Sequence, residues 1–193
     1  MSSSPLVGDP NLTLQSTIAG RRAVLERATV REIVMGAQDN LTTVLAVMLG
    51  VSIGSGRADM VALAGLSAAV AEAVSMGGVL YSSTRAEAAL EARAGTDRTE
   101  TTRARLAPVA SGVVTCLAAL LGGLVPLAPF VLLPLPAAIY ASVAASVVAL
   151  FLLGSVIGRI SGSTWWRDGI RLLLVAGLAA LASAAVGAAL RVG

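Results

Sequence analysis

The sequence contains no histidine, no lysine and a single cysteine, Cys116, among 193 residues. With one cysteine, the chain cannot form an internal disulfide or a cysteine-cluster zinc site. Without histidine, it lacks the commonest general base and metal ligand of enzymes. The sequence also shows no nucleophile motif and no glycine-rich phosphate loop. We therefore predict that the protein is not an enzyme and holds no resident cofactor.

Charged residues are scarce as well, at 13% of the chain, whereas 56% is hydrophobic and the mean hydropathy is +0.84. Soluble domains carry about 25% charged residues, so the composition indicates an all-α protein that crosses a membrane several times. Five apolar segments are long enough to span a bilayer as helices, near residues 33–54, 60–83, 106–125, 136–158 and 169–190. Four prolines between 125 and 136 are expected to break the helix there. Asp168 is expected to cap the last span, and Trp165 and Trp166 to anchor it at the interface.

The positive charge comes from arginine alone, and the distribution of the arginines predicts how the chain is oriented in the membrane. Twelve arginines lie at one set of span ends, and only Arg57 and Arg191 lie at the other. Because cytoplasmic loops are rich in arginine, we predict a cytoplasmic N-terminus and an outside C-terminus. The absence of an organelle signal favours the cytoplasmic membrane. We expect a polar N-terminus over 1–30, with a short interfacial helix or a frayed leader, and a five-helix transmembrane domain over 31–193 with a short cytoplasmic link at 84–105.

Two carboxylates interrupt the apolar spans, Asp39 in the first and Glu72 in the second. A carboxylate in the bilayer core costs several kcal/mol, so such residues usually mark a site or a path. Since the two spans are antiparallel, Asp39 and Met76 lie at similar depth, with Thr43 and Glu72 one helical turn deeper. We predict that these four side chains line one polar seam, with Ser75 next to Met76 as a further candidate ligand.

The seam has the chemistry of a divalent metal site. Carboxylate oxygens bind divalent cations, and a thioether is a soft ligand that Fe²⁺ tolerates but Mg²⁺ and Ca²⁺ do not seek. Burial also favours the protonated form of a carboxylate, so the same group can bind a proton when the metal leaves. One seam of this kind suits the exchange of a metal ion for protons.

These residues also have structural interpretations. A structural role for Asp39 is an ion pair with a nearby arginine, and one for Glu72 is a hydrogen bond between helices. A structural role for Met76 is to fill the core. The hydroxyl-bearing residues of the seam are consistent with simple helix packing. In the link between the second and third spans, Glu87 and Glu91 lie one turn apart, and they form either a metal site or a solvated face.

At these positions the chain resembles the vacuolar iron transporter family. The likeness lies in residues 31–43 (REIVMGAQDNLTT), 65–81 (GLSAAVAEAVSMGGVLY) and 126–130 (PLAPF), in the family's order among five spans. The family's first-span aspartate corresponds to Asp39, and its Ser-Met pair to Ser75 and Met76. The resemblance implies a homodimer that exports Fe²⁺, and often Mn²⁺, from the cytosol in exchange for protons, with the path at the dimer interface.

The chain departs from the family pattern in three places. It has Asn40 after Asp39 where the family often has glycine, and Val79-Leu80 where the family often has Gly-Glu before the tyrosine. Plant-type members insert a glutamate-rich, metal-collecting domain where this chain has only the link at 84–105. Two alternatives therefore stay open: a non-transporting membrane sensor or anchoring component of iron storage, and a transporter of another divalent cation. The expected partners are the lipid bilayer, a divalent metal ion and a second copy of the chain, with no nucleic acid.

Overall fold

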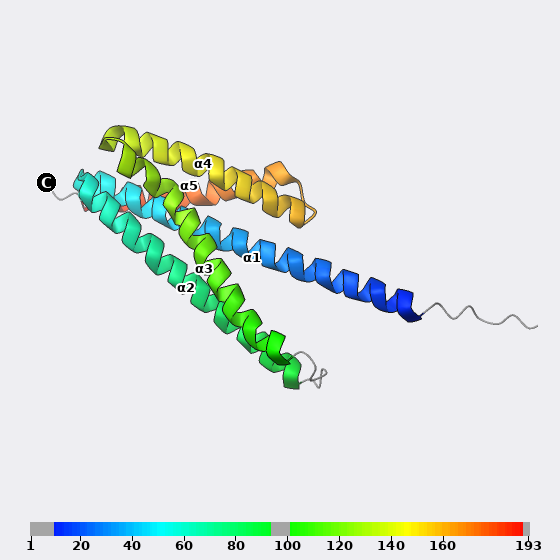
Figure 1. The fold of residues 1–193 in the computed structure, drawn as a ribbon. Coiled ribbons are helices and arrows are strands. Elements are labelled where there is room, and N and C mark those ends of the chain that lie inside the picture. The colour runs from blue at the N-terminus through cyan, green and yellow to red at the C-terminus, as the bar shows by residue number, and fades with distance from the viewer. Residues whose placement is uncertain (1–9, 94–100, 191–193) are drawn as a thin grey trace, which may run out of the picture.

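The computed structural model describes residues 10–93 and 101–190, with side chains placed for 30–90, 93 and 108–190. Within these ranges the chain forms five α-helices (Figure 1): α1 (Pro10–Ser55), α2 (Ala58–Arg93), α3 (Thr101–Leu132), α4 (Leu135–Ile160) and α5 (Trp165–Ala189). Each helix holds a segment long and apolar enough to cross a membrane: Val30–Ser55, Ala58–Leu90, Pro108–Leu132, Leu135–Ile160 and Trp165–Ala189. The prediction of an all-α chain with five spans is confirmed.

Helix α1 is the centre of the bundle, because it contacts each of the other four helices. Helices α2 and α3 lie together on one side of it, and α4 and α5 lie together on the other (Figure 1). The sequence has no proline between Pro10 and Ser55, so α1 runs without a break from its N-terminal extension into the first span. The interfacial location expected for that extension stays a prediction.

Glycines allow α1 to approach its neighbours closely. A Cβ atom at Gly122 of α3 would overlap the carbonyl oxygen of Ala37, and one at Gly187 of α5 would overlap the carbonyl oxygen of Gly50. Transmembrane helices associate mainly through such close packing, because lipid supplies no hydrophobic force between them. The contacts of α1 with α3 and α5 are therefore backbone against backbone.

The prediction that the prolines after residue 125 break the third span is wrong for Pro126 and Pro129. Helix α3 continues through both of them to Leu132, and the chain turns only before α4. Proline removes a backbone N–H, yet transmembrane helices tolerate it where the surrounding protein packs against them. Ser142 of α4 donates a hydrogen bond of 2.7 Å to the carbonyl oxygen of Pro126, so α4 binds this part of α3 inside the bundle.

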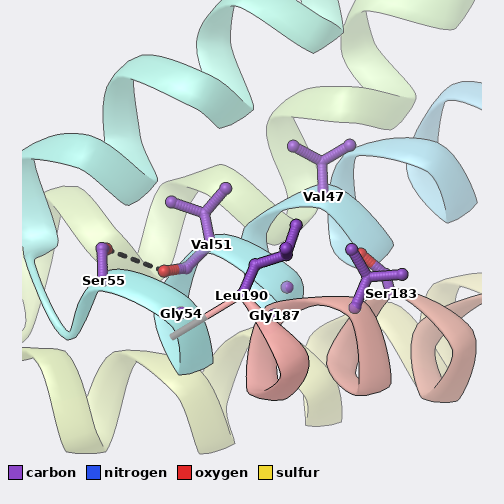
Figure 2. Close-up of a pocket in the computed structure, with 9 residues that line it drawn as sticks. Val47, Val51, Gly54, Ser55, Ser183, Gly187 and Leu190 are labelled. Atoms are coloured by element: carbon purple, nitrogen blue, oxygen red, sulfur yellow. Dashed lines mark hydrogen bonds between the residues drawn. The ribbon is translucent and has the colours of Figure 1, made fainter. Parts of the chain in front are cut away.

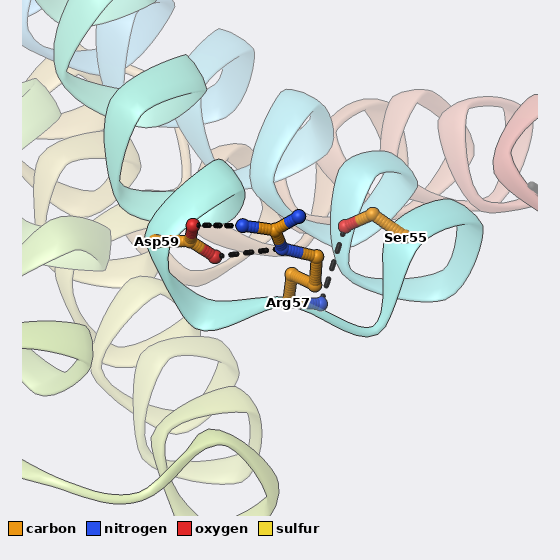
Figure 3. Close-up of polar contacts among 3 residues, drawn as sticks. All are labelled: Ser55, Arg57 and Asp59. Carbon is orange, nitrogen blue, oxygen red and sulfur yellow. Dashed lines mark hydrogen bonds and ion pairs between the residues drawn. The ribbon is translucent and has the colours of Figure 1, made fainter.

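The α1–α2 turn is tight because Gly56 has a φ of 62°, a left-handed conformation that favours glycine. Its polar groups are satisfied locally (Figure 3). The backbone N–H of Arg57 donates to Ser55 Oγ at 3.3 Å, and the guanidinium donates to both carboxylate oxygens of Asp59, at 3.2 and 2.5 Å. This ion pair raises the pKa of the Arg57 guanidinium above its ordinary value.

The turn between α4 and α5 differs from what the sequence predicts. Thr164 holds the N-cap position of α5, so the prediction that Asp168 caps this helix is wrong. The Asp168 carboxylate instead accepts hydrogen bonds from the Ser163 hydroxyl and from Arg171, the latter at 3.1 Å. Asp168 thereby ties the turn to the first residues of α5.

Candidate functional site

Two of the residues predicted to form the seam, Asp39 of α1 and Glu72 of α2, lie close to each other. The charge of the Asp39 carboxylate acts on the Glu72 carboxyl group. Glu72 is half-buried, whereas Asp39 is exposed on the surface of the single chain, although it lies well inside the span Val30–Ser55. Two carboxyls in such contact can hold a cation between them or share a proton.

The other seam residues lie on the same two helices. Met76 is half-buried and follows Glu72 by one helical turn along α2. Thr43 is half-buried and follows Asp39 by one helical turn along α1. Ser75 is exposed beside Met76. The carboxylate pair is thus bordered by a thioether and by hydroxyl groups.

The candidate residues of the predicted link belong to α2 and lie apart from the pair. Glu87 is exposed and accepts a hydrogen bond of 3.4 Å from Ser83. Its charge acts on Glu32 of α1, a residue that the sequence analysis missed although it lies two turns before Asp39 on the same face. The side chain of Glu91 lies outside the described residues. Among the described side chains, no group of three or more histidine, cysteine, aspartate or glutamate residues could hold a metal ion.

Asn40, next to Asp39, has a structural role that the sequence analysis also missed. Its side chain is completely buried, and its Nδ2 donates to the carbonyl oxygen of Ala69 on α2 at 2.9 Å and to that of Ala119 on α3 at 2.8 Å. Gly123 leaves the room for this amide, because a Cβ atom there would lie 3.0 Å from its Nδ2 and Oδ1. Asn40 therefore joins three helices directly beside the carboxylate pair. The sequence did contain a signal for this role, because an amide side chain within an apolar span needs buried hydrogen-bond partners.

Two pockets include neither carboxylate of the pair. One of about 340 Å³ lies between α1 and α5 (Figure 2) and is lined by Val47, Gly50, Val51, Gly54, Ser55, Ser183, Val186, Gly187 and Leu190. None of these residues is charged, and the Ser55 hydroxyl is already bonded to the carbonyl oxygen of Val51 at 2.7 Å. This pocket is therefore a poor cation site. The other, of about 260 Å³, lies between α1, α4 and α5 and includes Asp168 and Arg171.

Comparison with known families gives one clear result. The chain matches the model of the VIT family over residues 30–104 and 92–188, which together include all five spans and the Asp39–Glu72 pair. A comparison with curated proteins gave no match. Proteins of the VIT family are transporters of divalent metal ions, iron or manganese, and not enzymes. From the extent of the match and the five spans, the chain belongs to the VIT family and is a multi-pass membrane protein of divalent metal transport.

Proposed function

We propose that the protein exchanges Fe²⁺ or Mn²⁺ for protons across the cytoplasmic membrane, and that Asp39, Glu72 and Met76 line the path of the metal. The observation that carries this proposal is the proximity of two carboxyl groups inside two apolar spans. Ionisable groups at such positions are costly, and they characteristically belong to ion and proton pathways. The family match supplies the class of cargo.

The carboxyl pair suits exchange because it has two favourable states. With a divalent ion bound, both groups are ionised and share the charge of the cation. Without the metal, two carboxylates in contact repel each other, so the pair retains a proton. Binding of a metal ion therefore releases protons, and uptake of protons on the opposite side releases the metal. Met76 adds the soft ligand that favours Fe²⁺ over Mg²⁺, and Thr43 and Ser75 add hydroxyl oxygens.

We further propose that a second copy of the chain completes the path. Asp39 is exposed on the single chain at a depth where lipid would otherwise face it, and hydrocarbon does not solvate a carboxylate. A divalent metal takes about four to six ligands, more than the two carboxylates and one thioether of one chain. A two-fold axis beside α1 and α2 doubles that set and covers Asp39. The arginine bias favours a cytoplasmic N-terminus, so the metal leaves the cytosol.

Uptake of Fe²⁺ into liposomes that contain the purified protein tests this function. Asp39→Asn and Glu72→Gln should each slow uptake by roughly tenfold or more, because each removes one charged ligand, while the elution profile of the protein stays unchanged. Asp59→Asn is the matched control, since Asp59 is an exposed carboxylate in the first turn of α2. It should keep the wild-type rate.

The same assay separates the alternatives. Wild-type rates in both seam variants would show that the carboxylates are structural. A wild-type protein that moves no metal would favour the sensor or anchoring component. Uptake of Co²⁺ or Zn²⁺ but not of Fe²⁺ or Mn²⁺ would favour a transporter of another cation.

A further inference from the structure

The pocket of about 260 Å³ between α1, α4 and α5 divides into a charged part and an apolar part. Asp168 and Arg171 come from the start of α5, at the end of its span, whereas Leu172 and Val175 lie further along the same helix. Pockets that hold a whole small molecule measure about 300–1,000 Å³. A smaller pocket with this division fits one part of an amphiphile.

The surroundings of the charged part are basic. Residues 155–175 contain three arginines and one aspartate, which gives a net charge of +2. The guanidinium of Arg171 bonds Asp168, yet its side chain is 76% exposed, so it keeps free donors. Guanidinium groups of this kind bind phosphate oxygens in pairs. The charge favours a ligand whose head group is negative overall.

Two tryptophans hold the neighbouring arginines in place. The Arg167 guanidinium lies 5.4 Å from the ring centre of Trp166, and that of Arg159 lies 6.0 Å from the ring of Trp165. Such cation–π contacts leave the donors at the edge of the guanidinium plane available. Tryptophan is also the residue that settles at the level of lipid head groups.

A separate apolar stripe of α5 lies outside the pocket lining. Ile170, Leu174 and Leu178 are 42, 69 and 70% exposed, and they follow one another at helical spacing. The stripe begins beside the arginines and runs towards the middle of the span, the course that an acyl chain takes below its head group.

We propose that the corner of α4 and α5 binds an anionic phospholipid, with its phosphate on Arg167 and Arg171 and an acyl chain along α5. Basic pockets between transmembrane helices bind such head groups, and each arginine near an anionic membrane surface adds about fivefold to binding. The residues that line this pocket include neither Asp39 nor Glu72.

The protein carries its own reporter for this site, because Trp165 and Trp166 are its only tryptophans. The full chain is reconstituted in phosphatidylcholine vesicles that contain, at equal mole fraction, either brominated phosphatidylglycerol or brominated phosphatidylcholine. Bromine quenches tryptophan fluorescence on contact. From the quenching we expect a binding constant for brominated phosphatidylglycerol that is about fivefold or more above that for brominated phosphatidylcholine.

Three variants make the result specific. Arg167→Gln and the double variant Arg167→Gln with Arg171→Gln should reduce or remove the preference. Arg57→Gln should keep it, because Arg57 lies at the other end of the bundle. Added inorganic phosphate should not relieve the quenching, since it lacks the acyl chain. Equal quenching by the two lipids, a preference retained in the double variant, or relief by phosphate would each overturn the proposal.

Discussion

Replacing Asn40 with alanine tests whether its amide holds α1 in register beside α2 and α3. The change removes two hydrogen bonds, of 2.9 Å to Ala69 and 2.8 Å to Ala119. A buried hydrogen bond contributes about 1 kcal/mol to stability, and bonds between membrane helices average about 0.6 kcal/mol, so the loss is roughly 1–2 kcal/mol. Part of it is offset, because the partnerless Asn40 Oδ1 is removed too. A net loss of about 1 kcal/mol lowers Tm by about 2–4 °C.

The variant Asn40→Asp sharpens the test because it keeps the shape of the side chain. It places a carboxylate oxygen where Nδ2 now faces two carbonyl oxygens, and an unpaired buried charge is strongly destabilising. The protonated carboxyl can still donate one bond, so the variant should be more stable at pH 5 than at pH 8, and less stable than Asn40→Ala at pH 8. Tm is measured in detergent by tryptophan fluorescence. Wild-type Tm values for both variants would refute the role of Asn40.

The remaining predictions concern packing, selectivity and assembly. Gly122→Ala should lower Tm well below that of Gly177→Ala, because a Cβ at the first site overlaps a carbonyl oxygen of α1 and at the second meets nothing within 4 Å; equal Tm values would contradict the close contact. Met76→Leu keeps the volume but removes the sulfur, so competition assays should show a larger loss of Fe²⁺ selectivity over Mg²⁺ than of maximal rate; unchanged selectivity would exclude the thioether as a ligand. Met35→Cys in a Cys116→Ser background should cross-link two chains in membranes, since Met35 is 45% exposed and lies one helical turn before Asp39 on α1. Transport by this variant without any cross-linking would count against a metal path between two chains at this face of α1.

The number and positions of the membrane spans could be predicted from the sequence, because they depend on hydropathy and on the rise of a helix. Five apolar segments mark the spans, because a bilayer requires a minimum length of apolar helix. Counting residues from the turn places Asp39 level with Met76 and Glu72 one helical turn deeper, whereas in the structure the charge of Asp39 acts on Glu72. The structure agrees with the five predicted spans, and the seam as a metal site stays a prediction.

What could not be predicted depends on contacts between distant segments. Local propensity predicts that Pro126 ends a helix, whereas in the structure this part of α3 continues and is bonded to α4 by Ser142, sixteen residues away in the sequence. The partners of Asn40 are backbone carbonyl oxygens, which leave no mark in the side-chain pattern. The exposure of Asp39 likewise depends on which faces of α1 are covered by α3 and α5, and the polarity pattern of α1 alone does not determine this.

In the proposed exchange, one carboxyl pair carries a metal ion in one direction and protons in the other. The most direct test is proton movement driven by a metal gradient alone. Liposomes that contain the protein and an internal pH-sensitive dye receive Fe²⁺ outside, under reducing conditions and without a pH gradient. We predict that the internal pH rises as Fe²⁺ enters, and that Asp39→Asn slows both changes by roughly tenfold or more. Entry of Fe²⁺ with an unchanged internal pH, or a full response from Asp39→Asn, would contradict exchange at this pair.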